Sequence, residues 1–171
     1  MNLQLINPSI KYKESYHSYL VELDDEEKYP YPMDFDYSDF PALIKKLTNY
    51  SKGMGLPDWL VPNTTYWLIN GNEIIGVSHL RHHLNSALLE SGGHIGLGVR
   101  PSYRGKGYGN ILLDLTINEA KELGIDDIHI HCHKDNKVSS QMIQSSGGIL
   151  IDEIKEDGTD KIIERYIISA D

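Results

Sequence analysis

One stretch of sequence decides the fold of this 171-residue chain: Gly96-Leu97-Gly98-Val99-Arg100-Pro101-Ser102-Tyr103-Arg104-Gly105-Lys106-Gly107-Tyr108-Gly109. An apolar strand runs into a turn that carries a glycine at every second position, and an apolar-faced helix is predicted to follow over residues 108–123. Glycine N–H groups can converge on one concavity, and a helix start adds the positive end of its dipole. The stretch therefore predicts a diphosphate cradle that Arg104 and Lys106 make more positive.

Two common phosphate-binding patterns do not fit this turn. A P-loop needs serine or threonine after its lysine, whereas Lys106 is followed by Gly107. The dinucleotide pattern G-x-G-x-x-G needs its third glycine at position 110, where Asn110 stands. The pattern that remains is R-x-x-G-x-G, from Arg104 to Gly109.

Hydrophobic periodicity on both sides of the turn predicts one α/β domain over residues 1–171. Helices are expected over 8–26 and 38–50 before the turn and over 136–146 after it. An Asn70-Gly71 pair between two apolar runs predicts a β-hairpin. Further strands are expected over 3–6, 93–99, 127–133, 149–154 and 161–168. The order implies a single mixed sheet of about seven strands with helices on both faces.

Composition excludes several classes of protein. The net charge is −9, and a nucleic-acid binder usually carries a basic face instead, so no nucleic-acid partner is expected. Cys132 is the single cysteine and cannot form an internal disulfide, which fits a reducing compartment such as the cytoplasm. No apolar run of about 18 residues is present, and the first residues do not resemble a signal peptide, so neither a membrane span nor export is expected.

The charge is unevenly distributed along the chain. Segment 24–39 holds seven acidic residues against the single Lys28, whereas Arg100, Arg104 and Lys106 form a basic cluster without an acid. The acidic segment is either a solvated loop or a rim that attracts a cationic ligand.

The turn resembles the pyrophosphate loop of the GNAT acyltransferase superfamily. Asp135-Asn136-Lys137-Val138-Ser139 followed by Gly147-Gly148 is similar to the next strand–helix–strand block of that family, and the element order also fits, so the resemblance spans most of the chain. It implies a mostly antiparallel sheet that splays between strands 93–99 and 127–133. It also implies acetyl-CoA, or another acyl-CoA, as the donor, with the thioester in the gap.

The resemblance implies roles in acyl-CoA binding and catalysis for individual residues. The strand Leu97, Gly98 and Val99 would bond the pantetheine arm through its main chain. The diphosphate would be held by Arg104, Gly105, Lys106, Gly107, Tyr108 and Gly109. Asn136 would bond the pantetheine or the thioester end, with Ser139 and Ser140 nearby. The family often has a tyrosine seven residues after the asparagine to protonate the leaving thiolate, but Ile143 occupies that position, so a serine, another tyrosine or water would donate the proton.

A base that strips the proton from the acceptor amine is the second catalytic expectation. His94 is the first candidate because it lies on the strand that leads into the turn, and Glu90 is the second. The competing interpretation is that His94 is a strand residue bonded to a backbone carbonyl. The alternating His129, His131 and His133 share one strand face, but without further ligands no metal site is expected.

The sequence thus predicts transfer of an acetyl group from acetyl-CoA to a primary amine, by direct attack in a ternary complex. The acceptor is a small molecule or a peptide, and the acidic segment favours a cationic one. The alternatives are a CoA-binding sensor without turnover and a module for another nucleotide. Strand 161–168, if it lies at a sheet edge, would allow pairing in a homodimer.

Overall fold

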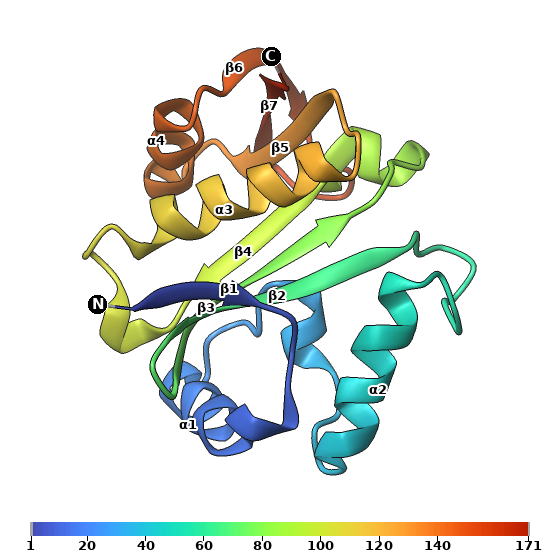
Figure 1. The fold of residues 1–171 in the computed structure, drawn as a ribbon. Helices are drawn as coiled ribbons and strands as arrows, with labels where there is room; N and C mark the ends of the chain where they lie inside the picture. Colours follow the sequence, from blue (N-terminus) through green and yellow to red (C-terminus); the bar gives the residue numbers. More distant parts are fainter. Residues whose placement is uncertain (1, 171) are drawn as a thin grey trace.

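The computed structural model describes residues 2–170, in which seven strands and four α-helices follow the predicted order (Figure 1). Their bounds are β1 Leu3–Ile6, α1 Lys13–Leu23, α2 Phe40–Ser51, β2 Asn63–Asn70, β3 Glu73–Arg81, β4 Ile95–Val99, α3 Tyr108–Glu122, β5 Asp127–His133, α4 Lys137–Ser145, β6 Ile149–Lys155 and β7 Ile162–Ser169. Short 3-10 turns cover Ile10–Tyr12, Tyr31–Asp34 and Pro101–Tyr103, and a π-helical turn covers Leu88–Gly92. Within residues 2–170 no helix is long and apolar enough to cross a membrane.

Two helix starts differ from the sequence prediction. The helix expected from residue 8 begins as the 3-10 turn Ile10–Tyr12 and becomes α-helical only at Lys13. In α2 the N-cap is Asp39 rather than a residue at 38, because the Asp39 carboxylate accepts the Ala42 N–H at 3.0 Å. A carboxylate at this position also interacts favourably with the helix dipole.

The strands form two antiparallel sheets, with the orders β1-β2-β3-β4 and β5-β7-β6. The predicted splay therefore divides the seven strands into two sheets instead of opening a single one. The sheets join where β4 and β5 begin. There the His94 N–H donates to the His129 carbonyl (2.7 Å), and the His129 N–H donates to Nδ1 of His94 (3.0 Å). Beyond this join β4 and β5 diverge.

The predicted place of strand 161–168 at a sheet edge is wrong. β7 lies in the middle of its sheet, because it pairs with β6 through a hairpin and with β5 on its other side. Its main-chain groups are consequently used on both sides and cannot pair with a second copy of the chain.

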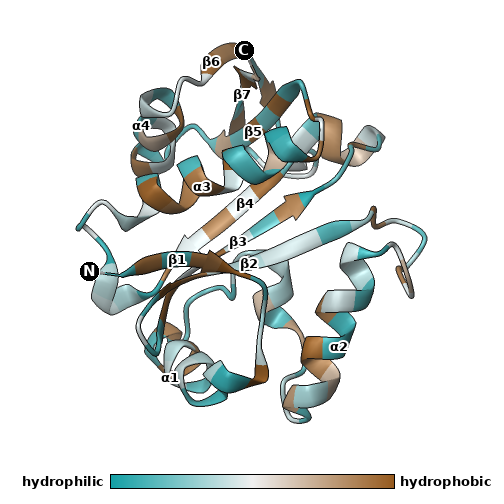
Figure 2. Ribbon diagram, in the orientation of Figure 1, coloured by the Kyte–Doolittle hydropathy of each residue, from teal (hydrophilic) through white to brown (hydrophobic). Residues whose placement is uncertain are grey.

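Three apolar clusters hold the layers together, the smallest of which packs Leu112 of α3 against Leu68 and Ile75. α1 and α2 cover one face of the first sheet, where they bury Trp67 and Val77. α3 covers the other face and supplies Leu113 and Ile117 to a core that also includes residues of β5 and β7. Figure 2 shows apolar residues concentrated in β1 and β4, between these helical layers. Because α3 packs on strands of both sheets, it fixes their relative position on one side of the splay.

Candidate active site

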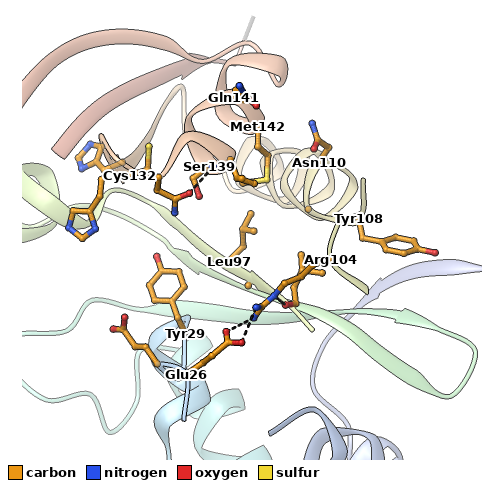
Figure 3. Close-up of a pocket in the computed structure, with 18 of the residues that line it drawn as sticks. Glu26, Tyr29, Leu97, Arg104, Tyr108, Asn110, Cys132, Ser139, Gln141 and Met142 are labelled. Carbon is orange, nitrogen blue, oxygen red and sulfur yellow. Dashed lines mark hydrogen bonds and ion pairs between the residues drawn. The ribbon is translucent and has the colours of Figure 1, made fainter. Parts of the chain in front are cut away.

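A cleft of about 1200 Å³ opens where β4 and β5 diverge. Its walls are β4, the glycine turn, the first residues of α3, the end of β5, the start of α4 and the connection between α1 and α2. Figure 3 shows side chains from these elements facing one another across the cleft, with Leu97 on β4 and Cys132 on β5. The cleft thus links the predicted cradle to the gap between the two sheets.

The free edge of β4 forms one wall of the cleft. β4 pairs only with β3, and the hydrogen bonds at its two ends, from the Arg81 N–H to the His94 carbonyl and from the Arg100 N–H to the Ile75 carbonyl, fix the register. Main-chain groups alternate sides in an antiparallel ladder. Those of Leu97 and Val99 therefore point away from β3 and toward β5. Gly98 lies between them and lines the same wall.

The glycine turn has the geometry of an anion cradle. Gly105 and Gly107 have φ angles of +71° and +82°, and a Cβ added to either would meet nothing within 4 Å. α3 begins directly after Gly107 without a side-chain cap, so the N–H groups that a first helical turn cannot bond internally lie at the cleft wall. Such a site attracts an anion.

Gly109 has a different role from the other two glycines. A Cβ there would lie 3.1 Å from the Met142 sulfur and 3.7 Å from a Val99 methyl group. Its lack of a side chain therefore allows α3 to pack closely against α4 and β4.

Of the three basic residues in the turn region, only Arg104 lines the cleft. Its Nε donates to the Val99 carbonyl (2.9 Å), and its Nη1 and Nη2 pair with the Glu26 carboxylate (3.1 and 2.8 Å), as Figure 3 shows. Lys106 turns back to the Ser102 carbonyl (2.9 Å). Arg100 is buried and pairs with Glu22 of α1. The predicted basic cluster thus contributes a single guanidinium to the cleft.

The residues carried over on α4 separate into two groups. Asn136 and Ser139 line the cleft, and the Asn136 side-chain oxygen caps α4 by accepting the Ser139 N–H (3.1 Å). Ser140 instead faces β7, where its hydroxyl bonds the Tyr166 hydroxyl (2.7 Å), and it does not line the cleft. Ile143 is 1% exposed and belongs to the core. The position expected for a tyrosine therefore offers no proton donor to the cleft.

The structure places both predicted bases outside the residues that line the cleft. His94 is 6% exposed, and its ring accepts the His129 N–H at the join of the sheets, so it bonds the backbone through an N–H and not through the carbonyl that the competing interpretation expected. Burial, together with the neighbouring His129, lowers the pKa of His94 to about 4. Glu90 is exposed on the π-helical turn. In this arrangement His94 serves to hold the sheets together.

We expect the free energy of unfolding to fall as the pH is lowered from about 6.5 toward 4. Burial lowers the pKa of His94 and of His131 to about 4, so in this window the unfolded chain binds protons that the folded chain does not. Each such group removes up to about 1.4 kcal/mol per pH unit. Urea unfolding of the wild type and of His94→Asn, which keeps an acceptor near Nδ1, should show a shallower pH dependence in the variant. Equal slopes would contradict this role.

The α1–α2 connection and the end of β3 bring further residues to the cleft, and of these sequence reasoning missed Tyr29. Glu27 and Tyr29 come from the connection, and Arg81 ends β3. The Tyr29 hydroxyl lies over β4, since a Cβ at Gly96 would meet it at 2.6 Å, and Figure 3 shows the ring pointing into the cleft. The glycines at 96 and 98 were a usable signal, because each leaves room for Tyr29.

Cys132 lines the cleft and also packs, partly buried, against the core that α3 shares with β5 and β7. Burial raises the pKa of its thiol to about 11. The thiol is therefore protonated near neutral pH and is a poor nucleophile. Within residues 2–170 no group of three histidine, cysteine or acidic side chains is arranged to hold a metal ion.

The fold and the cleft together define a class of protein: an α/β domain with a long cleft in the gap between two splayed antiparallel sheets and a glycine turn suited to an anion at one end of that cleft. The family model for the acetyltransferase (GNAT) family matches residues 16–147, and the chain belongs to that family. Among curated proteins, none matches this sequence.

Solved structures share the fold at low sequence identity. The ribosomal-protein-S5-alanine acetyltransferase from Vibrio fischeri has a TM-score of 0.73 and 15% identity, with 100% of this chain and 94% of that one covered. The microcin C7 self-immunity acetyltransferase MccE, in complex with acetyl-CoA and AMP, has a TM-score of 0.69 and 18% identity, with 98% and 92% covered. A spermidine N-acetyltransferase chimera from Vibrio cholerae and hSSAT has a TM-score of 0.68 and 13% identity, with 99% and 97% covered.

Proposed function

We propose that this protein transfers the acetyl group of acetyl-CoA to a primary amine by direct attack in a ternary complex in the cytoplasm. The observation that carries the proposal is the continuous cleft, which runs from the glycine cradle along the free edge of β4 to the gap beside Cys132. The glycine cradle at one end of the cleft suits the diphosphate of CoA, and the edge of β4 in the middle suits its uncharged pantetheine arm. Membership of the acetyltransferase family supports acetyl-CoA as the ligand.

The donor side of the site is assigned to the residues that line the cleft. The main-chain groups of Leu97 and Val99 bond the pantetheine arm along the edge of β4. The diphosphate lies against Gly105, Gly107 and the first turn of α3, and Arg104 contributes the positive charge. Asn136 and Ser139 border the arm from α4, and the side-chain nitrogen of Asn136 has no hydrogen bond within residues 2–170. Lys106 and Ser140 take no part in this assignment.

The chemistry needs no acyl-enzyme. A neutral amine attacks the thioester carbon, the C–S bond breaks, and CoA leaves as a thiolate. Cys132 is protonated and does not compete as a nucleophile. Desolvation of the hydroxyl raises the pKa of Tyr29, although the residue as a whole is 45% exposed. The hydroxyl therefore keeps a proton that it can give to the leaving thiolate, in place of the tyrosine absent at Ile143, and it regains a proton from water. The amine releases its own proton to water in the open cleft.

The acceptor side borders the α1–α2 connection, within the acidic segment. Only two of its acids, Glu26 and Glu27, line the cleft, and Glu26 is paired with Arg104. Asp36 bonds the Ser38 N–H and Asp39 caps α2. Glu27 has no hydrogen bond or ion pair within residues 2–170. We assign to Glu27 the attraction of the cationic acceptor, whose ammonium form predominates because its pKa is about 10.4 for a lysine-like amine.

A panel of amines with acetyl-CoA tests the function, with free thiol as the readout. We expect thiol release that depends on particular amines and yields the N-acetyl product by mass spectrometry. If acetyl-CoA binds tightly but no amino acid, polyamine, aminoglycoside or peptide causes release of free thiol, the protein is a CoA-binding sensor. Ile143, at the position where the family often has its catalytic tyrosine, is the feature that favours this alternative. Thermal stabilisation by ATP or NAD but not by CoA would instead indicate a module for another nucleotide.

A further inference from the structure

Arg81 stands apart from the other arginines of the chain. The sequence has four arginines, and the structure describes all of them. Arg100, Arg104 and Arg165 each pair with a carboxylate, from Glu22, Glu26 and Asp152 respectively. Arg81 is 8% exposed, yet it has no ion pair with any carboxylate in residues 2–170. A buried cation without a counter-charge is destabilising, so this arrangement calls for a reason other than stability.

The guanidinium of Arg81 is held in one orientation. Its Nη1 donates to the carbonyls of Gly92 and Gly93, at 3.0 and 3.1 Å. Its Nε and Nη2 make no hydrogen bond within residues 2–170. Neither nitrogen is fully buried, so both are accessible to solvent. Arg81 lines the cleft, and these two nitrogens form the guanidinium edge that presents two parallel N–H groups. This edge matches the two oxygens of a carboxylate.

The charges around this edge fit the two ends of one molecule. The positive charge of Arg81 lowers the pKa of Tyr29 and the negative charge of Glu27 raises it, so both charges lie near the Tyr29 hydroxyl. That hydroxyl lies over β4 beside the gap between the sheets. A cation and an anion that make no ion pair within residues 2–170 therefore flank the place where the acceptor amine must reach the thioester.

From this geometry we infer that the acceptor carries both an amine and a carboxylate, as an amino acid does. Its carboxylate binds the Nε–Nη2 edge of Arg81, and its amine lies near Glu27 and Tyr29. The inference rests on the proposed function and narrows it, because a polyamine would bring no anion to Arg81. The acidic segment predicted only that the acceptor is cationic. The inference adds that the acceptor also carries a negative charge.

The test compares matched acceptors that differ only in the anionic group. L-α-amino acids, their carboxamides, the corresponding amines without the carboxylate, and their phosphonate analogues are each assayed with acetyl-CoA for thiol release. We expect kcat/KM for the carboxylate form to exceed that for the carboxamide by at least about tenfold, the scale of a charge-assisted bidentate pair. A preference for the phosphonate would replace the carboxylate assignment by a phosphate one. Equal rates for acid and carboxamide would overturn the inference.

Variants separate this role from a purely structural one. In Arg81→Gln the ratio of acid to carboxamide should fall to about one, and Arg81→Lys, which keeps the charge but not the two-nitrogen edge, should give an intermediate ratio. Arg165→Gln is the matched control, since Arg165 also bonds a carbonyl of the π-helical turn, that of Leu89, but pairs with Asp152 and does not line the cleft. A ratio that stays at the wild-type value in Arg81→Gln contradicts the inference.

Equilibrium binding keeps the two proposals distinguishable. Titration calorimetry of the CoA-saturated wild type with the amino acids and their carboxamides needs no turnover and no substitution. Carboxylate-dependent binding without thiol release for any amine would reject the transferase and retain the anion site. Thiol release that depends on the amine but not on a carboxylate would retain the transferase and reject the anion site.

Discussion

Replacement of Gly107 by valine is expected to reduce acetyl-CoA affinity by on the order of 100-fold or more, the loss of at least two charge-assisted hydrogen bonds. At φ +82° a Cβ on this residue would project into open space at the glycine cradle and occupy the volume assigned to the diphosphate. The left-handed conformation adds a cost of about 1–2 kcal/mol to folding for any residue with a Cβ.

Gly124→Val is the matched control for this substitution. Gly124 follows the other end of α3, has a φ of +78°, and also has nothing within 4 Å of an added Cβ. It carries the same backbone strain but does not line the cleft. Calorimetric titration with acetyl-CoA should therefore show a loss of affinity in the first variant only, while both lose similar thermal stability. Retained affinity in Gly107→Val would show that the diphosphate binds elsewhere.

Changes at the Arg104–Glu26 pair are expected to move acetyl-CoA affinity in opposite directions. Arg104→Gln removes the one guanidinium at the cradle and should weaken binding by about 10- to 100-fold, the range for a hydrogen bond to a charged group. Glu26→Gln frees that guanidinium from a competing carboxylate and should tighten binding by about two- to fivefold, since exposed ion pairs are weak.

A truncated donor makes this prediction specific to the diphosphate. Acetyl-pantetheine lacks the diphosphate, so its KM should be the same for the wild type, Arg104→Gln and Glu26→Gln. If Arg104→Gln weakens acetyl-pantetheine as strongly as acetyl-CoA, the guanidinium contributes to the cleft's shape and not to anion binding. Raising the salt concentration should reduce the difference between the variants, because the charges involved are exposed.

The element order and the backbone geometry of the glycine turn could be predicted from sequence because their signals are local. A strand, a glycine turn and a helix lie within fourteen residues, so the positive φ of Gly105 and Gly107 and the uncapped start of α3 follow from neighbours in the chain. The Asn136 cap on α4 is equally local. The match of the family model to residues 16–147 confirms the predicted family membership.

Apart from the two shifted helix starts, the errors in the sequence prediction concern long-range pairing. Lys106 and Arg104 are near neighbours in the chain with the same charge, but only Arg104 meets Glu26, which lies 78 residues earlier. β7 is internal because β5, 29 residues before it, pairs with it on the side away from β6. No local pattern encodes either partner.

By itself the sequence determined the family of this protein and the backbone geometry of the glycine turn, because backbone conformation at glycines and helix ends depends on adjacent residues. Only the tertiary structure decided which side chains reach the cleft. His94 became a hydrogen-bonded link between two sheets, whereas Arg81 became a cation in the cleft wall that makes no ion pair with any of residues 2–170, since each role depends on a segment distant in the chain. Burial and partnership, which set the chemistry of a side chain, are properties of packing.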